Sequence, residues 1–458
     1  MFEKLVEITD FLWGTPLIIL ILLVGVYLTV RTGFFQFTGI GLTVKKTFGE
    51  MFKKDGGSTG EGTLSPFQAL STVLAGTVGS GNIAGVAAAI AIGGPGAVFW
   101  MWIVAIFGML TKMAEVSLSI KYRIKGTDGE FYGGPMHYIQ DGLGKKWKPL
   151  AILYSIGLFL IVVADACFVQ VNTLATAAKD AYGIPLLVTG VIAIAISLLV
   201  IAGGTKRIGE FCAKMVTPMC LVWIVGCLIV IGCNFDKIGS AFGMIFKYAF
   251  APLPAVGGFA GSTIALAMGR GASRGIFSNE AGEGTAATVH ATAKTDDPIH
   301  QGLYGIVEVF IDTIIICSLT ALAILTTGVW SSGDTGIYLT FSAFRSVLGN
   351  WGVWIAGAAV MLFCFSSYLG FFVEFRTCLE HLIGEKATKY AKWLFFIPPI
   401  FSVTMEIEAV WSLADMAVGL VFVPNMIALI ALSPQFFAML KAYKAKIKAE
   451  NAVEAKTK

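Results

Sequence analysis

Charged side chains are scarce in this sequence. Asp, Glu, Lys and Arg make up 14% of the 458 residues, whereas an ordinary soluble domain carries about 25%. Only four histidines occur, and none belongs to an H-E-x-x-H pattern, which argues against a zinc protease. A nucleotide-binding P-loop is also missing, which disfavours transport driven by ATP. The eight cysteines lie in or beside apolar segments without metal-like spacing, and we interpret them as small core hydrophobes.

Apolar residues take the place of the charges. They make up 56% of the chain and the mean hydropathy is +0.78, which indicates a polytopic all-α membrane protein. With a window of about 20 residues, the sequence predicts eleven spans. They are 11–30, 66–92, 95–120, 149–178, 184–202, 208–233, 257–289, 302–327, 352–376, 391–405 and 409–432. No small-residue cleavage site follows the first span, so we expect it to be retained as a helix.

Lys and Arg are concentrated in the loops that alternating spans place on one side. By the positive-inside rule the C-terminus is cytoplasmic and the N-terminus outside, in the cell membrane. Removing the first span leaves five spans in each half, and because five is odd the halves form an inverted repeat. The expected units are an N-terminal helix with a cytoplasmic loop (1–64), a first five-helix repeat (65–233), an extracellular connection (234–256), a second five-helix repeat (257–432) and a basic cytoplasmic tail (433–458).

Glycines interrupt one membrane-length segment in each half. The first predicted break lies at 77–82, with the sequence T-V-G-S-G-N, and the second at 268–271, with the sequence M-G-R-G. Backbone freed from a helix inside a membrane is tolerated only where protein or a polar cavity satisfies it, so paired breaks indicate a transporter's substrate site. The alternative is that these glycines merely permit close helix packing.

The breaks offer donors and acceptors for a solute that carries both an anionic and a cationic group. A half-helix beginning near Asn82 would direct free N–H groups and its positive dipole end at a carboxylate. The carbonyl oxygens of Gly76, Thr77 and Met268 would accept from the ammonium group. Sodium prefers oxygen ligands, which freed carbonyls also supply.

Several side chains are candidates to complete this site. Ser366 and Ser367 in the ninth span offer hydroxyl ligands to sodium, or else bond back to their own helix. Gln170 in the fourth span is expected to reach the substrate, whereas Asp165 is equally compatible with helix pairing and with ion binding. Walls that restrict substrate size are expected from residues that flank the breaks, namely Phe168, Met268, Ile276 and Phe277.

Three stretches carry a resemblance to a known family. The sixteen residues 93–108, G-G-P-G-A-V-F-W-M-W-I-V-A-I-F-G, resemble the signature of the alanine or glycine:cation symporters, the sodium:alanine symporter family. The stretches G-G-P-M at 133–136 and S-N-E-A-G-E-G at 278–284 are similar to that family as well. The resemblance implies sodium-coupled uptake of alanine or glycine on the LeuT-type fold of the amino acid–polyamine–organocation superfamily, with two discontinuous helices in a 5+5 inverted repeat and one extra N-terminal helix.

A second likeness is local. Residues 78–82, V-G-S-G-N, are similar to the unwound first core helix of sodium:neurotransmitter symporters. This likeness implies that Ser80 and Gly81 donate backbone N–H groups to the substrate carboxylate and that Ala75 and Val78 give carbonyl oxygens to sodium. The candidate substrate-binding residues are therefore Thr77, Gly79, Ser80, Gly81, Phe168, Gln170, Met268, Gly269, Ile276 and Phe277, and the candidate sodium ligands are Ala75, Val78, Ser366 and Ser367.

The resulting hypothesis is a secondary transporter that carries alanine or glycine with sodium by alternating access. Its partners are a small neutral amino acid, sodium and the lipid bilayer, with no nucleic acid. One rival is proton coupling through Asp165, Glu280 or Glu283 on the same fold. A channel is disfavoured because no selectivity-filter repeat occurs, and an intramembrane enzyme because no histidine or nucleophile motif lies within a span.

Overall fold

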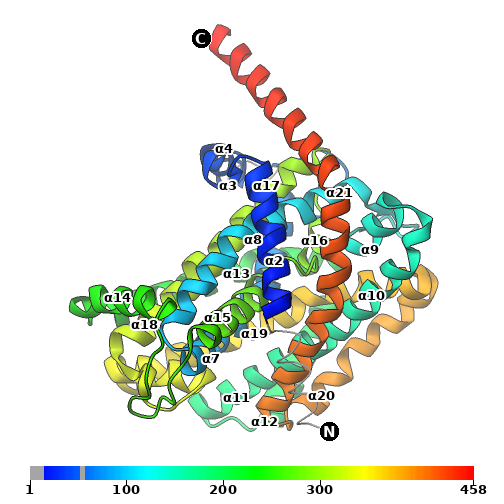
Figure 1. Cartoon of the computed structure of the whole chain (residues 1–458). Helices are drawn as coiled ribbons and strands as arrows, with labels where there is room; N and C mark the ends of the chain where they lie inside the picture. Colours follow the sequence, from blue (N-terminus) through cyan, green and yellow to red (C-terminus); the bar gives the residue numbers. More distant parts are fainter. Residues whose placement is uncertain (1–14, 52–56, 458) are drawn as a thin grey trace.

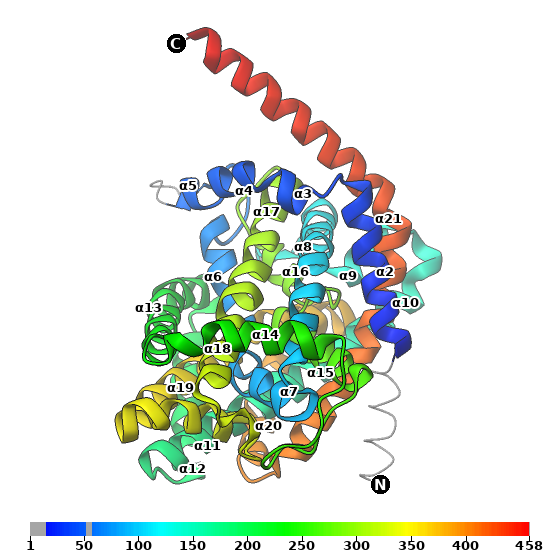
Figure 2. The same ribbon diagram turned by 60° about the vertical axis from the view of Figure 1, so that its left-hand side comes forward.

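The computed structural model describes residues 15–51 and 57–457. These residues are nearly all helical, and a long C-terminal helix projects from the helical body (Figures 1 and 2). One short antiparallel pair occurs, β1 (Ile124–Lys125) with β2 (Phe131–Tyr132), in which Ile124 faces Tyr132.

The helices of the first half, with π-helical or 3-10 segments marked η, are α2 (Thr15–Arg31), α3 (Phe35–Thr38), α4 (Ile40–Lys46), α5 (Phe48–Met51), α6 (Pro66–Thr77), η1 (Gly81–Gly85), α7 (Val86–Gly93), α8 (Gly96–Tyr122), α9 (Pro135–His137), η2 (Tyr138–Gly142), η3 (Lys145–Trp147), α10 (Lys148–Val162), η4 (Val163–Gln170), α11 (Val171–Tyr182), α12 (Leu186–Ile201) and α13 (Gly204–Gly232). Those of the second half are η5 (Phe235–Lys237), α14 (Ile238–Ala249), α15 (Ile264–Asn279), α16 (Ala286–His290), α17 (Pro298–Val309), η6 (Phe310–Cys317), α18 (Ser318–Thr327), η7 (Val329–Ser331), α19 (Gly336–Ala391), η8 (Lys392–Phe396), α20 (Pro398–Ser402) and α21 (Ile407–Thr457).

Fewer helices than expected meet a strict test for a membrane span. Among the described residues, six are long and apolar enough to cross a membrane, or seven if one bent pair counts as a single span. Two shorter apolar helices, Pro16–Arg31 and Leu186–Ile201, fall where spans were expected. The expected span 391–405 falls at the end of the 67-residue helical stretch Gly336–Ser402, which passes this test as a whole and is kinked at Gly349 and Gly384. Within it, the expected span consists of η8 followed by the short helix α20. Pro398 and Pro399 stand in the first turn of α20, where proline starts a helix better than it continues one.

The first predicted break is confirmed. Helix α6 begins at a complete capping box, in which Ser65 and Gln68 bond each other's backbone N–H groups, an arrangement that stabilises a helix start. It ends at Thr77, and the axis turns by 51° before Gly81–Gly93 continues the segment. Helix α6 and the continuous segment formed by η1 and α7 thus meet at residues 78–80.

The second break was predicted in the wrong place. Helix α15 runs unbroken through Met268 and Gly269 to Asn279, and the interruption lies in the loop 280–285. There Glu280 adopts a left-handed φ of 54° and Gly282 a φ of 102°. The interrupted loop belongs to the S-N-E-A-G-E-G stretch rather than to M-G-R-G.

Close helix packing explains the glycines that suggested the wrong position. A Cβ on Gly271 would lie 2.1 Å from the carbonyl oxygen of Ala97, and one on Gly275 would lie 2.8 Å from Val104. Both contacts are with α8, so these small residues let α15 and α8 approach each other, as small residues do at membrane helix interfaces.

This packing generates a stability prediction. Gly271→Ala should destabilise the protein by about 1–3 kcal/mol, since the added methyl meets backbone that cannot move aside. Gly269→Ala is the matched control: a Cβ there has nothing within 4 Å, and alanine favours helix over glycine by about 1 kcal/mol. The apparent melting temperature in detergent should fall for the first variant and hold or rise for the second. Equal melting temperatures would contradict the packing role.

Candidate functional site

At the interruption between α6 and α7, backbone N–H groups donate hydrogen bonds to side chains. The Gly79 N–H donates to Asn82 Oδ1 at 2.9 Å, and the Ser80 N–H donates to Gln170 Oε1 at 3.0 Å. In a continuous α-helix these donors would bond to the carbonyl oxygens four residues earlier, those of Ala75 and Gly76. The break therefore leaves those two carbonyl oxygens without their helical donors.

Three segments distant in sequence converge on this break. Gln170 comes from η4, and Ser367, from the long helix α19, donates a hydrogen bond to the freed Gly76 carbonyl. A Cβ on Gly79 would lie 2.9 Å from Gln170 Oε1 and 3.0 Å from Ser367 Oγ. Glycine is required here because two side chains press against its backbone. Gln170 in turn donates to Asp165 Oδ1 at 2.7 Å.

A fully buried carboxylate lies on the other side of the break. Asp312 of η6 accepts from Asn82 Nδ2 at 2.6 Å and from the hydroxyls of Ser278 and Thr313, each at 2.8 Å. All three donors are neutral. Burial of a carboxylate is tolerable because its oxygens are hydrogen-bonded, and the contact joins the first broken segment to the end of α15 through Ser278.

Aromatic rings close one side of the site. A Cβ on Gly81 would lie 3.3 Å from the Phe277 ring, whose centroid is 5.0 Å from that of Trp411 on α21. The Arg274 guanidinium lies 4.6 Å from the Trp411 ring centroid and makes a buried bidentate ion pair with Asp415, with N–O distances of 3.0 and 2.9 Å. This pair holds α15 to α21 beside the site. Trp411 and Asp415 were not among the expected residues, although a carboxylate inside an apolar span is a general signal of a polar interior.

The structure brings some expected residues together and separates others. Gly79, Ser80, Gly81, Gln170, Ser367 and Phe277 meet at the first break, and Ala75 and Val78 lie in its backbone. Ile276 is buried next to Phe277 and Phe168 is half-buried in η4. The Thr77 hydroxyl bonds back to Val73, so only its backbone faces the break.

Three expected residues have no place at the break. The Ser366 hydroxyl donates to Phe363 O at 2.9 Å, within its own helix, and lies 3.4 Å from Met219 Sδ. Met268 and Gly269 precede Phe277 by eight or nine residues of continuous helix, which is about 13 Å along the axis. Their backbone is helical rather than free, so the expected carbonyl of Met268 is not exposed by a break.

One polar atom at the break has no partner among the described residues. The Ser80 hydroxyl is fully buried and accepts or donates no hydrogen bond there. An unsatisfied buried hydroxyl costs about 1–3 kcal/mol. A bound polar solute would remove that cost.

A second polar cluster surrounds the loop 280–285. Lys112 lies 3.0 Å from Glu308, whose other oxygen is 3.1 Å from His290, and all three side chains are fully buried. Asn425 on α21 donates to Glu115 at 2.6 Å and to the Gly282 carbonyl at 2.8 Å. The second interruption is thus also satisfied by side chains of neighbouring helices.

At the end nearest the C-terminal tail, the two broken segments are tied together. The backbones of 59–64 and 292–294, which precede α6 and follow α16, are hydrogen-bonded to each other. Arg123, at the end of α8, donates to the carbonyl oxygens of Ala291, Ala293, Glu61 and Thr295 at 2.6–2.8 Å. Nearby, an ion pair at 2.7 Å with Lys125 holds the pKa of Glu61 below its ordinary value. Backbone hydrogen bonds and the Arg123 guanidinium thus join both segments at this end.

The chain is similar to known proteins over nearly its whole length. Residues 1–457 match the model of the sodium:alanine symporter family. A Haemophilus influenzae protein described as an uncharacterized transporter is 38% identical over 444 residues, which cover 96% of each chain. The sodium/alanine symporter AgcS of Methanococcus maripaludis is 36% identical, over 95% of this chain and 96% of that one. The crystal structure of MhsT in complex with L-phenylalanine superposes with a TM-score of 0.55 at 15% identity, covering 82% of this chain and 90% of that one, so the fold is shared with LeuT-like transporters.

Gln170 is expected to be essential to the break. Gln170→Ala leaves the Ser80 N–H and Asp165 without the partner that they have here and removes an amide donor that a bound anionic group could use. A missing hydrogen bond of that kind costs about 1–3 kcal/mol, which should weaken solute binding about tenfold. Gln170→Glu keeps an acceptor for Ser80 but sets a second carboxyl beside Asp165, so its defect should diminish as the pH falls and one carboxyl is protonated. Radiolabelled solute binding measured against pH tests both variants. A Gln170→Ala variant that binds normally would sink the interpretation.

Arg123 is expected to keep the tail-side end closed. Arg123→Ala removes four hydrogen bonds to backbone, so hydrogen–deuterium exchange of 59–64 and 291–295 should rise about tenfold or more. Lys125→Ala removes only a solvent-exposed ion pair with Glu61, which water screens, and should leave exchange nearly unchanged. If both variants exchanged alike, the closure would not depend on Arg123.

Proposed function

Because the chain belongs to the sodium:alanine symporter family, we propose that it takes up small neutral amino acids, alanine and glycine, together with sodium. Members of the family are transporters and not enzymes. The observation that carries the proposal is the interrupted segment α6–α7, whose freed backbone groups meet Gln170 and Ser367 in the buried interior. The coupled ion and the solute would bind side by side at this interruption.

The amino acid would bind across the break. Its carboxylate would accept hydrogen bonds from the N–H groups of Ser80 and Gly81. These lie at the start of the second half-helix, where the helix dipole favours an anion. The Ser80 N–H is bonded to Gln170 Oε1, so the carboxylate would replace that acceptor and accept from the Gln170 amide in turn. The unpartnered Ser80 hydroxyl supplies a further donor, and carbonyl oxygens of Gly76 and Thr77 would receive the ammonium.

Sodium would bind on the α19 side of the same interruption. The carbonyl oxygen of Ala75 has lost its helical donor, and Val78 ends α6 with a non-helical ψ of 83°. The Ser367 hydroxyl, which bonds the adjacent Gly76 carbonyl, completes an all-oxygen set of the kind that a hard cation prefers. Ser366 is less suited, because its hydroxyl is directed elsewhere.

The walls of the site favour a small side chain. Phe277 lies against Gly81 and is itself covered by Trp411. A solute with additional methylenes would have to displace these rings, and discrimination of that kind is typically worth about 1–3 kcal/mol per methylene.

Alternating access would use the two interrupted segments. We propose eleven spans, counting the shorter apolar helices and dividing the kinked stretch Gly336–Ser402. Ten of them would form an inverted repeat of five and five (65–233 and 257–432), with the C-terminus in the cytoplasm. The Arg123 hydrogen bonds that join the two interrupted segments would then lie at the cytoplasmic end. Breaking them would release solute and sodium together. The membrane potential contributes about 2.3 kcal/mol per sodium ion per 100 mV.

Proton coupling is the second candidate, and one observation favours it. The buried carboxyls of Glu115, Glu280, Glu283 and Glu374 outnumber the single buried cation Lys112 in the cluster around loop 280–285. Several uncompensated charges cannot be kept in a water-poor interior. Protons would then occupy some of these carboxyls, and their exchange would be available to drive transport.

Uptake into proteoliposomes tests the proposal. Labelled alanine should accumulate under an inward sodium gradient and not under matched potassium or proton gradients. Ser367→Ala should raise the half-saturating sodium concentration about tenfold, since it removes one ligand oxygen worth about 1.5 kcal/mol. The matched control Ser366→Ala should change it by no more than about twofold.

The outcomes separate the candidates. Accumulation under a proton gradient alone would overturn sodium coupling and direct attention to the buried carboxyls. Equal effects of the two serine substitutions would reject the sodium site while leaving the transport activity intact.

A further inference from the structure

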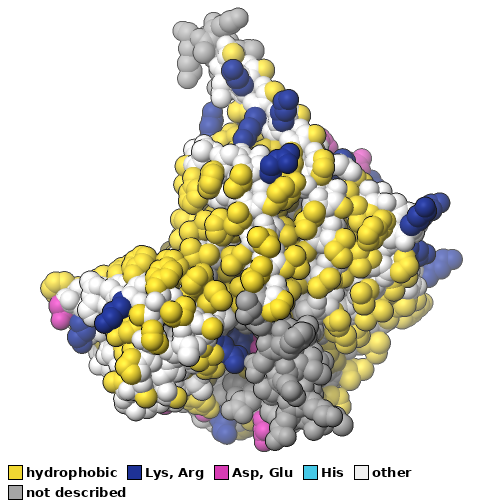
Figure 3. All heavy atoms as spheres, viewed as in Figure 1, with side chains coloured by type: hydrophobic (Ala, Val, Ile, Leu, Met, Phe, Trp, Pro, Cys, Tyr) yellow, Lys and Arg dark blue, Asp and Glu magenta, His cyan; other side chains and the backbone are white. Residues whose placement is uncertain are grey.

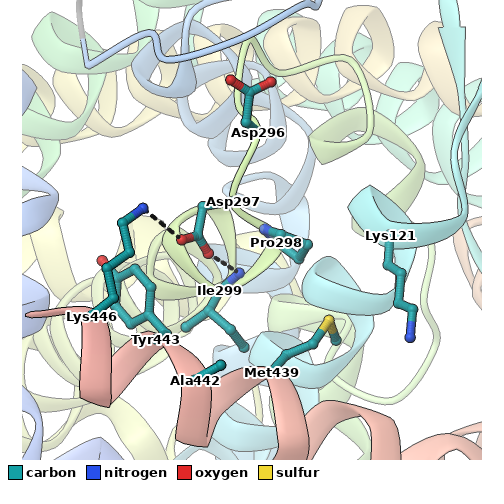
Figure 4. A pocket seen from close by; sticks show the side chains of 9 residues that line it. All are labelled: Lys121, Asp296, Asp297, Pro298, Ile299, Met439, Ala442, Tyr443 and Lys446. Carbon is teal, nitrogen blue, oxygen red and sulfur yellow. Dashed lines mark hydrogen bonds and ion pairs between the residues drawn. The ribbon is translucent and has the colours of Figure 1, made fainter.

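Three pockets surround α21 where it leaves the helical body, and their charges differ. One of about 400 Å³ is lined by Lys121 and Lys446 but also by Asp296 and Asp297 (Figure 4). Lys446 lies 3.4 Å from Asp297, which also caps α17, so this pocket holds two carboxylates against two ammonium groups and one such pair is in contact. A second pocket sets Lys45 and Lys46 against Glu50 and Glu450, and Lys46 pairs with both acids.

The charged side chains that line the third pocket are all cationic. We call it the basic cleft: it is lined by Arg31, Thr32, Phe437, Leu440, Lys441 and Lys444, and it has a volume of about 210 Å³. No carboxylate lines it. Lys444 Nζ lies 3.4 Å from the Thr32 carbonyl oxygen, and the Arg31 guanidinium lies 5.0 Å from the Phe437 ring centroid. The C-terminal end of α2 carries a partial negative charge of about half an elementary charge, which would repel an anion. The three full positive charges of the basic cleft outweigh it.

The basic cleft stands at the end of an apolar face. Helices α2 and α21 lie side by side in both views (Figures 1 and 2). On α2 the exposed apolar residues are Ile19, Leu23, Val26 and Val30, and on α21 they are Leu420, Val423, Ile427 and Ile430. Each set follows helical spacing and so forms one stripe. In Figure 3 hydrophobic side chains cover this face, and basic side chains gather above it where the tail begins.

The neighbouring segment marks the level of the membrane surface. Phe34, Phe37, Ile40 and Val44 on and around the short helices α3 and α4 are exposed, immediately after α2 ends at Arg31. Short helices with exposed apolar residues beside a span lie in the interface between head groups and acyl chains. The basic cleft is therefore at head-group depth, with its cations above and its apolar stripes below.

We propose that the basic cleft binds the phosphate of an anionic phospholipid from the leaflet on the tail side, with the acyl chains against α2 and α21. Arg31, Lys441 and Lys444 would surround the phosphate, while Phe437 and Leu440 contact the glycerol backbone and first methylenes. A free phosphate would satisfy the cations but not the apolar floor and stripes. This site requires only that the chain be embedded in a membrane, so it does not depend on the solute or the coupled ion.

Titration with lipids by native mass spectrometry tests the site. The purified full chain in detergent is titrated with phosphatidylglycerol, phosphatidylcholine or inorganic phosphate. Phosphatidylglycerol should bind at least about tenfold more tightly than phosphatidylcholine, because each nearby cation attracts an anionic lipid by roughly a factor of five. Inorganic phosphate should not displace it at comparable concentrations.

Variants locate the preference on the basic cleft. The triple variant Arg31→Gln, Lys441→Gln, Lys444→Gln should lose the preference for phosphatidylglycerol. The control Lys45→Gln, Lys46→Gln, Lys446→Gln removes the same formal charge from the two mixed pockets and should keep the preference within about twofold. Lys441→Glu supplies a single change on an exposed side chain, with an expected loss of at least about fivefold, should the triple variant fold poorly.

Three results would overturn the proposal. An unchanged preference in the triple variant and in Lys441→Glu would show that the lipid binds elsewhere. An equal loss in the control would show that diffuse surface charge attracts the lipid. Displacement by inorganic phosphate at matched concentration would identify a soluble anion as the ligand.

Discussion

Everything at the centre of this molecule depends on satisfying backbone groups where there is no water to do so. A helix interrupted inside a membrane exposes N–H and C=O groups that hydrocarbon cannot bond. Here the side chains of Asn82, Gln170 and Ser367 take that role at residues 76–80. Because they belong to α6–α7, η4 and α19, the break can exist only when these segments are packed together.

Buried ion pairs extend the same constraint to side chains. Lys112 and Glu308 join α8 to α17, and Arg274 and Asp415 join α15 to α21. Removing one member of such a pair would strand a charge in the interior, at a cost of about 3–5 kcal/mol. The helices flanking the second interruption are therefore tied together by charge as well as by close packing at Gly271 and Gly275.

The end of the molecule on the side of the C-terminal tail combines two features. At the tail side, Arg123 bonds both interrupted segments and the lysine-rich end of α21 begins. An anionic lipid seated between α2 and α21 would hold these helices at a fixed depth.

The sequence alone determined the class of the protein and one of its two breaks. Its apolar runs and scarce charges indicated a membrane protein, since spans are set by length and hydropathy. The residues T-V-G-S-G-N marked the first interruption, because glycines loosen the helix locally. Gln170 and Ser367 were also expected at this break, since polar side chains inside spans are rare, and both contact it. Their role in binding stays a prediction.

The tertiary structure decided what local signals cannot. Glycine permits both an interruption and a close helix contact, and only the position of Ala97 shows that Gly271 serves packing while the interruption lies at 280–285. Adjacent serines are equivalent in sequence, yet helix rotation turns Ser367 toward the break and Ser366 toward Met219. The partners Asn82–Asp312 and Arg274–Asp415 are more than 100 residues apart, so which donor meets which acceptor was settled by how the helices pack.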